Sequence, residues 1–394
     1  MIDKLSPNEC ALCGSCADAC PTGAISFDKE YLDFRYPVID PDKCVSCGLC
    51  EKACPVLSLG AKAADTQEEH RVYAARNPDT DVRRSSSSGG VFWALAKNTL
   101  SCGGYVCGAV FDEEFHVRHM ISNREEDVRK MMGSKYAQSD LTGVYKQVRE
   151  LLRDGKQVLF TGCPCQVAGL RSFLGSDHEN LLTADIICHG IPSGIMLRAH
   201  LDYLEKKYRS KIETLCFRDK KYGWHRSAVR IRFSNGAEYC IPYIADAYIK
   251  GFLNGTTLKE SCFDCRFRNF RSGSDLTMGD FWGAEAVLPN LDDNIGLSAV
   301  IANSEKSITA LQQCGLDLHA ANLDTVIRYN RKLIDSTKRS SDRDAFYLYA
   351  QKNGYSAAIG KLLTESLPDK LRREGSYRLR CLRNYLLGRK KPLY

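Results

Sequence analysis

The sequence lacks any uninterrupted apolar run of the roughly 18 residues that a membrane span needs. It also does not open with a basic segment followed by an apolar core, and we therefore expect a soluble, cytoplasmic protein. In a reducing compartment, 19 cysteines are more typical of metal ligation or redox chemistry than of disulfides. A secreted disulfide scaffold is disfavoured by size as well, because 394 residues can bury a core without covalent cross-links. This length suggests two or three domains.

Two further patterns are missing. No G-x-G-x-x-G or Walker sequence occurs, so a Rossmann-type nicotinamide site is not indicated. The body also lacks excess charge: residues 367–394 hold nine Lys or Arg against two acidic residues, and the rest of the chain balances at 46 against 46. We therefore expect no nucleic-acid binding. The basic tail could form an amphipathic helix for an anionic membrane surface or an acidic protein partner, or a solvated helix that docks on its own domain.

The cysteines at the start of the chain form a duplicated motif. The pattern C-x2-C-x2-C-x3-C-P occurs twice within sixty residues. In this pattern three closely spaced thiolates bind one 4Fe-4S cluster, and the cysteine before proline reaches the other cluster. Zinc is the alternative for C-x2-C pairs, but it does not require this interlocked fourth cysteine. We predict one cluster on Cys10, Cys13, Cys16 and Cys54 and another on Cys20, Cys44, Cys47 and Cys50, as in a bacterial two-cluster ferredoxin.

Downstream of Arg71, candidate strands and helices alternate, which indicates a mixed α/β or α+β fold. Asn235-Gly236 predicts the turn of a hairpin. The expected organisation is a ferredoxin domain at 1–57, a linker at 58–70, a mixed α/β body at 71–330 and a helical basic tail at 331–394. Because the linker lacks periodicity, we expect a chain that begins at Arg71 to fold without the ferredoxin domain.

A second group of cysteines lies in the body. Cys163, Cys165 and Cys188 each follow an apolar strand, at the end where α/β folds collect their sites. Cys262 and Cys265 form an isolated C-x2-C, which is half a metal site, and a zinc knuckle with another pair remains open. Separately, the run Ser85–Gly90 opens a predicted helix. Its hydroxyls, bare N–H groups and helix dipole favour either a phosphate or an ordinary cap.

Seven strings in unbroken order carry a resemblance to a known family: SSSGGVFWALA, GSKYAQSDL, CPCQVAGLRSFLG, DIICHGIPS, CFRDKKYGW, SCFDCRFRN and DLTMGDFWG. They resemble the beta subunit of coenzyme F420-reducing hydrogenases and dehydrogenases, in the bacterial form with a fused two-cluster ferredoxin. The resemblance implies a flavoprotein that binds FAD beside a 4Fe-4S cluster and moves electrons between a two-electron carrier and one-electron centres.

The resemblance also implies site residues. A third 4Fe-4S cluster would be held by Cys165, Cys188, Cys262 and Cys265, with a zinc site or buried thiols as alternatives. Threonine is usual in the family where this chain has Cys163, so Cys163 would be a spare thiol or a rival ligand. The FAD would contact Ser86, Ser87, Ser88, Gly89, Gly90, Lys135, Tyr136, Trp224, Asp280 and Trp282, although ordinary capping, solvation or core packing could explain each.

The function expected from these features is that of an iron-sulfur flavoprotein oxidoreductase. Clusters accept one electron at a time, whereas FAD can also exchange a hydride. Electrons would pass between ferredoxin, or another one-electron carrier, and an organic substrate or deazaflavin carrier. The alternative is a non-catalytic electron-transfer subunit of a larger hydrogenase, dehydrogenase or membrane complex.

Overall fold

The computed structural model describes residues 2–58 and 70–386 of the chain. It divides the chain into two compact units, Met1–Ile195 with Leu258–Lys338, and Met196–Thr257 with Arg339–Tyr394. Both units therefore contain sequence from the expected body. The expected linker at 58–70 and the end of the basic tail lie largely outside the described residues. The sequence-based domain boundaries stay a prediction.

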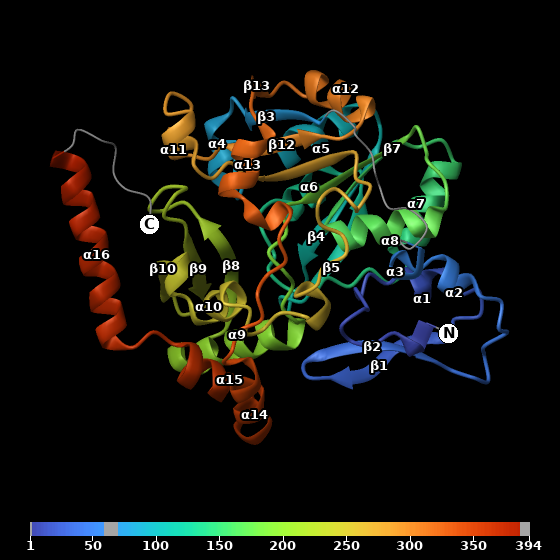
Figure 1. Ribbon diagram of the computed structural model, residues 1–394, viewed down its shortest axis with the longest axis horizontal. Coiled ribbons are helices and arrows are strands. Elements are labelled where there is room, and N and C mark those ends of the chain that lie inside the picture. Colours follow the sequence, from blue (N-terminus) through green and yellow to red (C-terminus); the bar gives the residue numbers. More distant parts are fainter. Residues whose placement is uncertain (1, 59–69, 387–394) are drawn as a thin grey trace. The chain divides into compact units, whose positions relative to one another are not determined.

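The first unit is built on an eight-stranded mixed sheet (Figure 1). Its strands follow the order β13-β3-β12-β11-β7-β6-β4-β5. The neighbours β4, β6, β7 and β11 are parallel, and the flanking pairs are antiparallel. The strands are β3 (Arg71–Arg76), β4 (Tyr105–Phe111), β5 (Val117–Ser122), β6 (Val158–Gly162), β7 (Leu181–Ile186), β11 (Leu276–Asp280), β12 (Ser298–Ala302) and β13 (Asp317–Ala320). This sheet confirms the mixed α/β class.

Helices cover both faces of this sheet. Strand β6 shows the arrangement, because Leu159 belongs to a core with α5, α6 and α12, whereas Val158 and Phe160 belong to a core with α7 and α8. A strand covered on both faces is apolar at every position, which explains the run Val158–Phe160. The helices of this unit's body are α4 (Thr80–Ser85), α5 (Val91–Ser101), α6 (Glu125–Met131), α7 (Val144–Arg153), α8 (Pro164–Leu174), α11 (Ala284–Val287), α12 (Glu305–Gln313) and α13 (Leu323–Tyr329).

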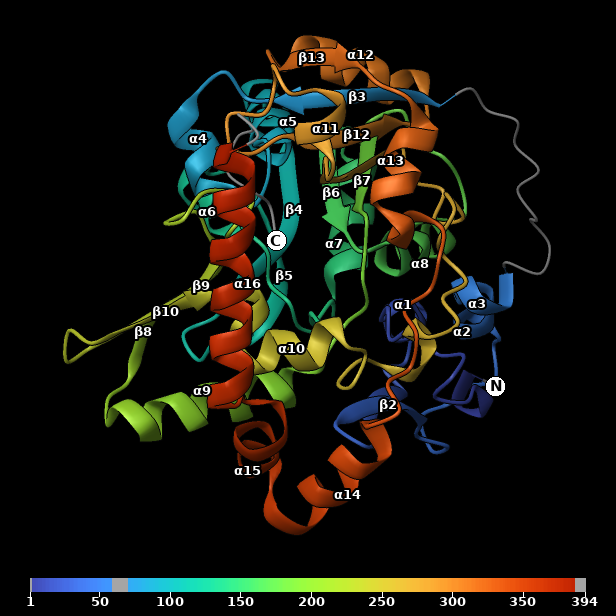
Figure 2. The same ribbon diagram turned by 60° about the vertical axis from the view of Figure 1, so that its left-hand side comes forward.

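The ferredoxin-like segment belongs to the same unit and packs on α7 and α8 (Figures 1 and 2). Its elements are α1 (Ser15–Ala19), α2 (Leu49–Lys52), α3 (Pro55–Ser58) and the antiparallel pair β1 (Ile25–Tyr31) and β2 (Phe34–Ile39). The buried Asp18 carboxylate accepts hydrogen bonds from the N–H groups of Gly143 (2.7 Å) and Tyr145 (2.9 Å). Residues of this segment therefore supply the N-terminal cap of a helix of the body.

The second unit combines a three-stranded antiparallel sheet with helices. Its strands are β8 (Ile212–Asp219), β9 (Ala228–Phe233) and β10 (Glu238–Pro242), and the Asn235-Gly236 turn between β9 and β10 confirms the predicted hairpin. The helices are α9 (Gly194–Tyr208), which begins in the first unit, α10 (Ala247–Leu253), α14 (Arg343–Asn353), α15 (Tyr355–Ala358) and α16 (Leu367–Leu386). Within residues 2–58 and 70–386, none of the helices combines the length and the apolar character needed to cross a membrane.

Candidate functional site

Cysteines follow the carboxyl ends of two neighbouring parallel strands. Strand β6 ends at Gly162, directly before Cys163 and Cys165, and β7 ends at Ile186, two residues before Cys188. Strands β6, β7 and β11 run parallel, so their carboxyl ends meet at one edge of the sheet. This is the edge at which open α/β folds collect their sites.

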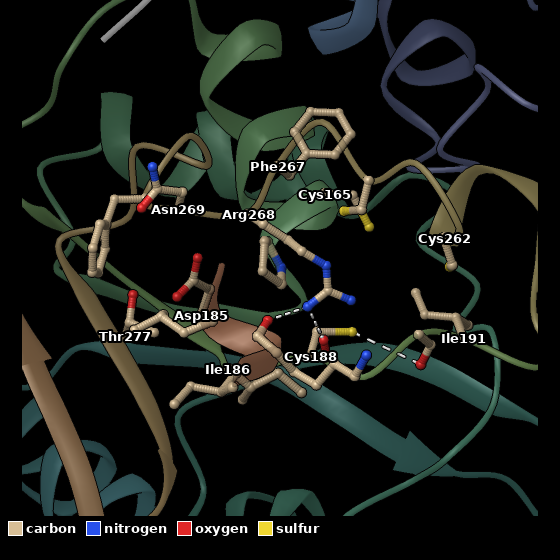
Figure 3. A pocket seen from close by; sticks show the side chains of 17 residues that line it. Cys165, Asp185, Ile186, Cys188, Ile191, Cys262, Phe267, Arg268, Asn269 and Thr277 are labelled. Atoms are coloured by element: carbon tan, nitrogen blue, oxygen red, sulfur yellow. Dashed lines mark hydrogen bonds between the residues drawn. The ribbon is translucent and has the colours of Figure 1, made fainter. Parts of the chain in front are cut away.

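One cavity of about 40 Å³ at this edge is lined by four cysteines, Cys165, Cys188, Cys262 and Cys265. They are the four cysteines that the family resemblance groups together. Figure 3 shows three of them around the side chain of Arg268, whose guanidinium donates to the carbonyl oxygens of Cys188 (2.6 Å) and His189 (3.2 Å). Apolar side chains, including Ile187, Ile191 and Phe267, complete most of the wall. The donor set therefore suits a thiolate-bound iron-sulfur cluster.

Burial makes these cysteines poor acids without metal. It raises the pKa of the Cys165 thiol to about 12 and that of Cys262 to about 11. Cys188 differs, because a hydrogen bond from the Cys163 thiol and the charge of Arg268 lower its pKa to about 7 against the opposing effect of burial. Iron that binds such thiols takes the place of their protons, so metal binding and proton release are coupled.

Cys163 lies beside this set without lining the cavity. It is the N-cap residue of α8, where its side chain accepts from the backbone N–H of Gln166. In return, the Gln166 side-chain oxygen accepts from the Cys163 backbone N–H (2.8 Å). This reciprocal capping box gives Cys163 a structural task in addition to its contact with Cys188.

A second cavity, of about 20 Å³, lies in the ferredoxin-like segment. Its lining includes the four cysteines that the interlocked motif assigns to one cluster: Cys10, Cys13, Cys16 and Cys54. Burial raises the pKa of each of these thiols. The fourth cysteine thus reaches across from the second copy of the motif, as the cluster geometry requires.

The other ferredoxin set lies nearer the surface. Cys47 is exposed, and the remaining three, Cys20, Cys44 and Cys50, are partly exposed. They line neither of the two cavities. Their assignment to the second cluster stays a prediction from the motif.

In the described ranges, no group of three or more His, Cys, Asp or Glu side chains is arranged to hold a metal ion. A zinc ion gathers its sulfur ligands at about 2.3 Å from a single point. A cubane spreads its ligands more widely, because each of its four irons takes a different cysteine.

Four residues that sequence reasoning did not single out connect the two cysteine cavities. The Tyr145 hydroxyl lies 2.9 Å from the carbonyl oxygens of both Cys13 and Gln166. The Gln138 amide donates to the Leu12 carbonyl (3.2 Å). The other two connecting residues are Lys259, whose ammonium donates to Ala11, and Gly169, whose missing side chain leaves room for Cys13.

The sequence could have indicated some of these four residues, but not their contacts. Gln138 and Gly169 lie inside the strings that carry the family resemblance, and Lys259 lies two residues before another such string. Nothing in the strings indicates what these residues contact, because their partners in the Cys10–Cys13 loop are more than a hundred residues away in the chain. Their roles depend on tertiary packing.

The serine-glycine loop predicted to contact FAD lies along the same sheet edge. Gly89 donates its N–H to the Ser298 hydroxyl (2.9 Å), and the Ser88 hydroxyl donates to the Leu297 carbonyl (2.9 Å). Ser298 pairs with Asp280 at the carboxyl end of β11. Trp282 follows two residues later, so the structure brings Ser88 and Gly89 to the same edge as Asp280 and the cysteine-bearing strand ends.

The same loop meets the second predicted flavin segment. The Ser87 hydroxyl lies 2.8 Å from the Ser134 hydroxyl and accepts from the Ser134 N–H (2.9 Å). The Ser86 hydroxyl instead donates back to the Val82 carbonyl (2.8 Å). Gly90 adopts a positive φ of 85° as the N-cap of α5, which glycine accepts without strain. The loop is thus a well-ordered helix start that lies beside residues 133–136.

The remaining predicted flavin contacts are dispersed. The Lys135 ammonium donates to the carbonyls of Lys130, Met132 and Gly133 and so caps the end of α6. Tyr136, the next residue, is partly buried. Trp224 belongs to the second unit and is completely buried there, as expected for a core residue. None of the predicted flavin contacts lines either of the two cavities described above.

Comparison with known proteins identifies the parts of the chain. Residues 9–57 match a 4Fe-4S dicluster domain, and a second model of such a domain matches residues 36–85. Residues 72–146 match the N-terminal part, and residues 155–323 the C-terminal part, of the coenzyme F420 hydrogenase/dehydrogenase beta subunit. The predicted family and its fused ferredoxin domain are both confirmed.

Individual relatives cover less of the chain. A stretch of 166 residues is 31% identical to the coenzyme F420-dependent sulfite reductase of Methanocaldococcus jannaschii and makes up 41% of this chain. The chain spans about a quarter of that relative, since the match covers 24% of its length.

Among solved structures, a chain of the F420-reducing NiFe hydrogenase complex from Methanosarcina barkeri, studied as a xenon derivative, matches with a TM-score of 0.46 and 16% identity. The match covers 72% of this chain and 93% of that one.

The two consecutive subunit models span most of residues 72–323, and the chain therefore belongs to the coenzyme F420 hydrogenase/dehydrogenase beta-subunit family.

Proposed function

We propose that this chain is an iron-sulfur flavoprotein oxidoreductase. In this proposal, electrons pass between the two ferredoxin-type clusters and a third cluster, held by Cys165, Cys188, Cys262 and Cys265. From there they reach an FAD that exchanges a hydride with an organic substrate or a deazaflavin carrier such as coenzyme F420. That the chain carries iron-sulfur clusters and is an oxidoreductase follows from its dicluster domain and its family. The third cluster, the flavin and the hydride exchange are the proposed part.

The observation that carries the proposal is the direct connection between the two cysteine cavities. The carbonyl of Cys13, in the first set, and that of Gln166, next to Cys165 of the second set, share the Tyr145 hydroxyl. An added Cβ on Gly169 would lie only 3.0 Å from the Cys13 sulfur. Clusters bound in the two cavities would therefore be neighbours, which is the requirement for one-electron transfer between them.

Support for the flavin comes from the sheet edge. The start of α5 directs N–H groups and the positive end of a helix dipole toward this edge, a combination that favours phosphate groups. Ser134, bonded to Ser87 of this loop, is only four residues from Gln138, which contacts the Cys10–Cys13 loop. Four residues span at most about 14 Å, so the serine-glycine loop and the Cys10–Cys13 loop are connected through a short segment. When bound, FAD would supply the exchange between hydride and single electrons.

The alternative, a non-catalytic electron-transfer subunit, has its support in helix α16. Leu367, Leu371 and Leu379 are exposed on this basic helix. Apolar residues exposed among basic ones suit contact with a protein partner or an anionic surface. The soluble one-electron partner in the proposed reaction is a ferredoxin or a similar carrier.

Cofactor content tests the proposal. Protein purified and reconstituted without oxygen is expected to hold roughly 12 iron atoms, from three clusters of four, and one FAD per chain. Iron and flavin are measured by colorimetric assay and by absorbance of the released flavin. Saturation at roughly eight irons would contradict the third cluster, whereas full iron without flavin would favour the electron-transfer alternative.

A further inference from the structure

Lys259 is completely buried, and its charged group lies between the two cysteine cavities. Its exposed fraction is 0%. Its ammonium donates to the carbonyl of Ala11, next to Cys10 of the first set, and to the side-chain oxygen of Gln138 (3.3 Å). Its own backbone N–H donates to the Ile191 carbonyl (2.9 Å), and Ile191 lines the cavity at the sheet edge. Cys262 of the second set is only three residues further along the chain.

The two acceptors of the Lys259 ammonium are uncharged. Within residues 2–58 and 70–386, no carboxylate forms an ion pair with it. A buried ammonium without a counter-charge is strongly unfavourable, and such a lysine normally loses its proton. Burial lowers the pKa of Lys259, whereas Cys165, Cys262 and Cys10 raise it when they carry the charge of thiolates, the form in which they would bind iron. These cysteines come from both cavities.

A buried ammonium at this position is stabilised by negative charge on both sides, which thiolate-bound clusters would supply. Four thiolates around a cluster leave the whole centre negatively charged, and the charge grows by one unit when the cluster is reduced. A fixed cation stabilises the reduced state more than the oxidised state. It therefore raises the reduction potential of any centre beside it, and most strongly in a buried environment.

We propose that the Lys259 ammonium is a fixed positive charge shared by the two neighbouring iron-sulfur centres, which raises the reduction potential of both and holds the Cys10–Cys13 loop against the second centre. This inference rests on the proposed function, because it requires a cluster on Cys165, Cys188, Cys262 and Cys265. It makes Lys259 a positioning and tuning residue rather than a ligand. Arg268 is a second cation beside the same cysteines, where it donates to the Cys188 carbonyl.

Two neutral variants of the full-length protein test the charge. Lys259→Gln keeps an amide donor for Ala11 and removes the charge, and Lys259→Met removes both. An EPR-monitored redox titration of the reconstituted proteins is expected to show lower potentials for the centre on Cys10, Cys13, Cys16 and Cys54 and for the third centre. We expect about a tenfold fall in the reduction equilibrium constant of each, about 59 mV for a one-electron step.

The second ferredoxin-type cluster serves as an internal reference for the redox titration. The cluster assigned to Cys20, Cys44, Cys47 and Cys50 is expected to keep its potential, because the strongest charge effects on Lys259 come from Cys165, Cys262, Cys10 and Cys163 instead. Lys259→Arg, which keeps the charge, should restore all potentials. Lys306→Met is a control for the loss of a lysine charge away from the cavities. Lys306 donates to the carbonyls of His178 and Leu181 and forms an ion pair with Asp275, but it lines neither cavity.

The possible outcomes separate the role of Lys259 from the proposed function. Full iron content with unchanged potentials in both neutral variants overturns the role of Lys259. Iron loss in the neutral variants but not in Lys259→Arg supports the positioning role, because of the three variants only Lys259→Arg keeps the positive charge, whereas iron loss in all three contradicts it. Wild-type protein with iron for only two clusters instead overturns the third cluster, and with it the sharing of the charge.

Discussion

At the scale of single residues, Cys163 and Cys165 show how two thiols of one short loop acquire different tasks. The Cys165 side chain lines the cavity with three other cysteines. The Cys163 side chain caps α8 and donates to Cys188. Their spacing in the sequence does not distinguish them, since both follow the same strand. The capping box with Gln166, which Cys163 forms, distinguishes the two residues.

We predict that Cys165→Ser removes about four iron atoms per chain, whereas Cys163→Ser leaves the iron content at the wild-type level. Serine is itself a good N-cap residue, so the second variant should keep α8 intact. Iron content and the EPR spectrum of the reduced protein are the measurements. If Cys163→Ser loses the iron and Cys165→Ser keeps it, Cys163 is the ligand and the assignment of this loop is wrong.

At the scale of elements, helix α8 joins the central sheet to the ferredoxin segment. Its inner face packs Val167, Leu170 and Phe173 in the core with α7. Its outer face presents Ala168 to a core that includes Cys16 and Cys54. Gly169 allows this close approach, because an added Cβ would lie 3.0 Å from both the Cβ and the sulfur of Cys13.

Gly169→Ala should therefore weaken the contact between α8 and the first cluster. Alanine is the better helix former, but forcing a methyl group into a packed site typically costs about 1–3 kcal/mol. Chemical unfolding of the reconstituted protein should show this loss, together with a faster loss of iron. Gly194→Ala in α9 is the control, because no atom lies within 4 Å of its added Cβ. Equal stability of the two variants would argue against tight packing at Gly169.

At the scale of the whole molecule, the ferredoxin segment is part of the first unit rather than an appended module. Asp18 caps α7 from outside the body. Val56 and Cys54 share a core with Ala168 and Phe267. From the sequence alone, the body is expected to fold without this segment. These contacts are a physical reason to expect instead that the body depends on it.

Removal of residues 1–70 should therefore destabilise the remaining chain. The truncation leaves the first N–H groups of α7 without their acceptor and exposes the apolar surface around Phe267. Limited proteolysis and thermal unfolding of full-length and truncated protein provide the measurement. Asp18→Ala in the full chain isolates the cap, for which we expect a loss of about 1–2 kcal/mol. A truncated chain as stable as the full-length protein would show that the body folds independently.

The sequence alone determined the iron-sulfur identity of the N-terminal segment, the family, the mixed α/β class and the Asn235-Gly236 hairpin. Each of these depends on short local patterns, some of them repeated along the chain, and cluster loops and two-residue turns have fixed spacing rules. The tertiary structure decided the capping of α7 by Asp18, the approach of Cys13 to Gly169 and the burial of Lys259. It also joined residues 196–257 to residues 339–394 in one unit. These contacts join residues far apart in the chain, and periodicity carries no information on which distant segments pack together.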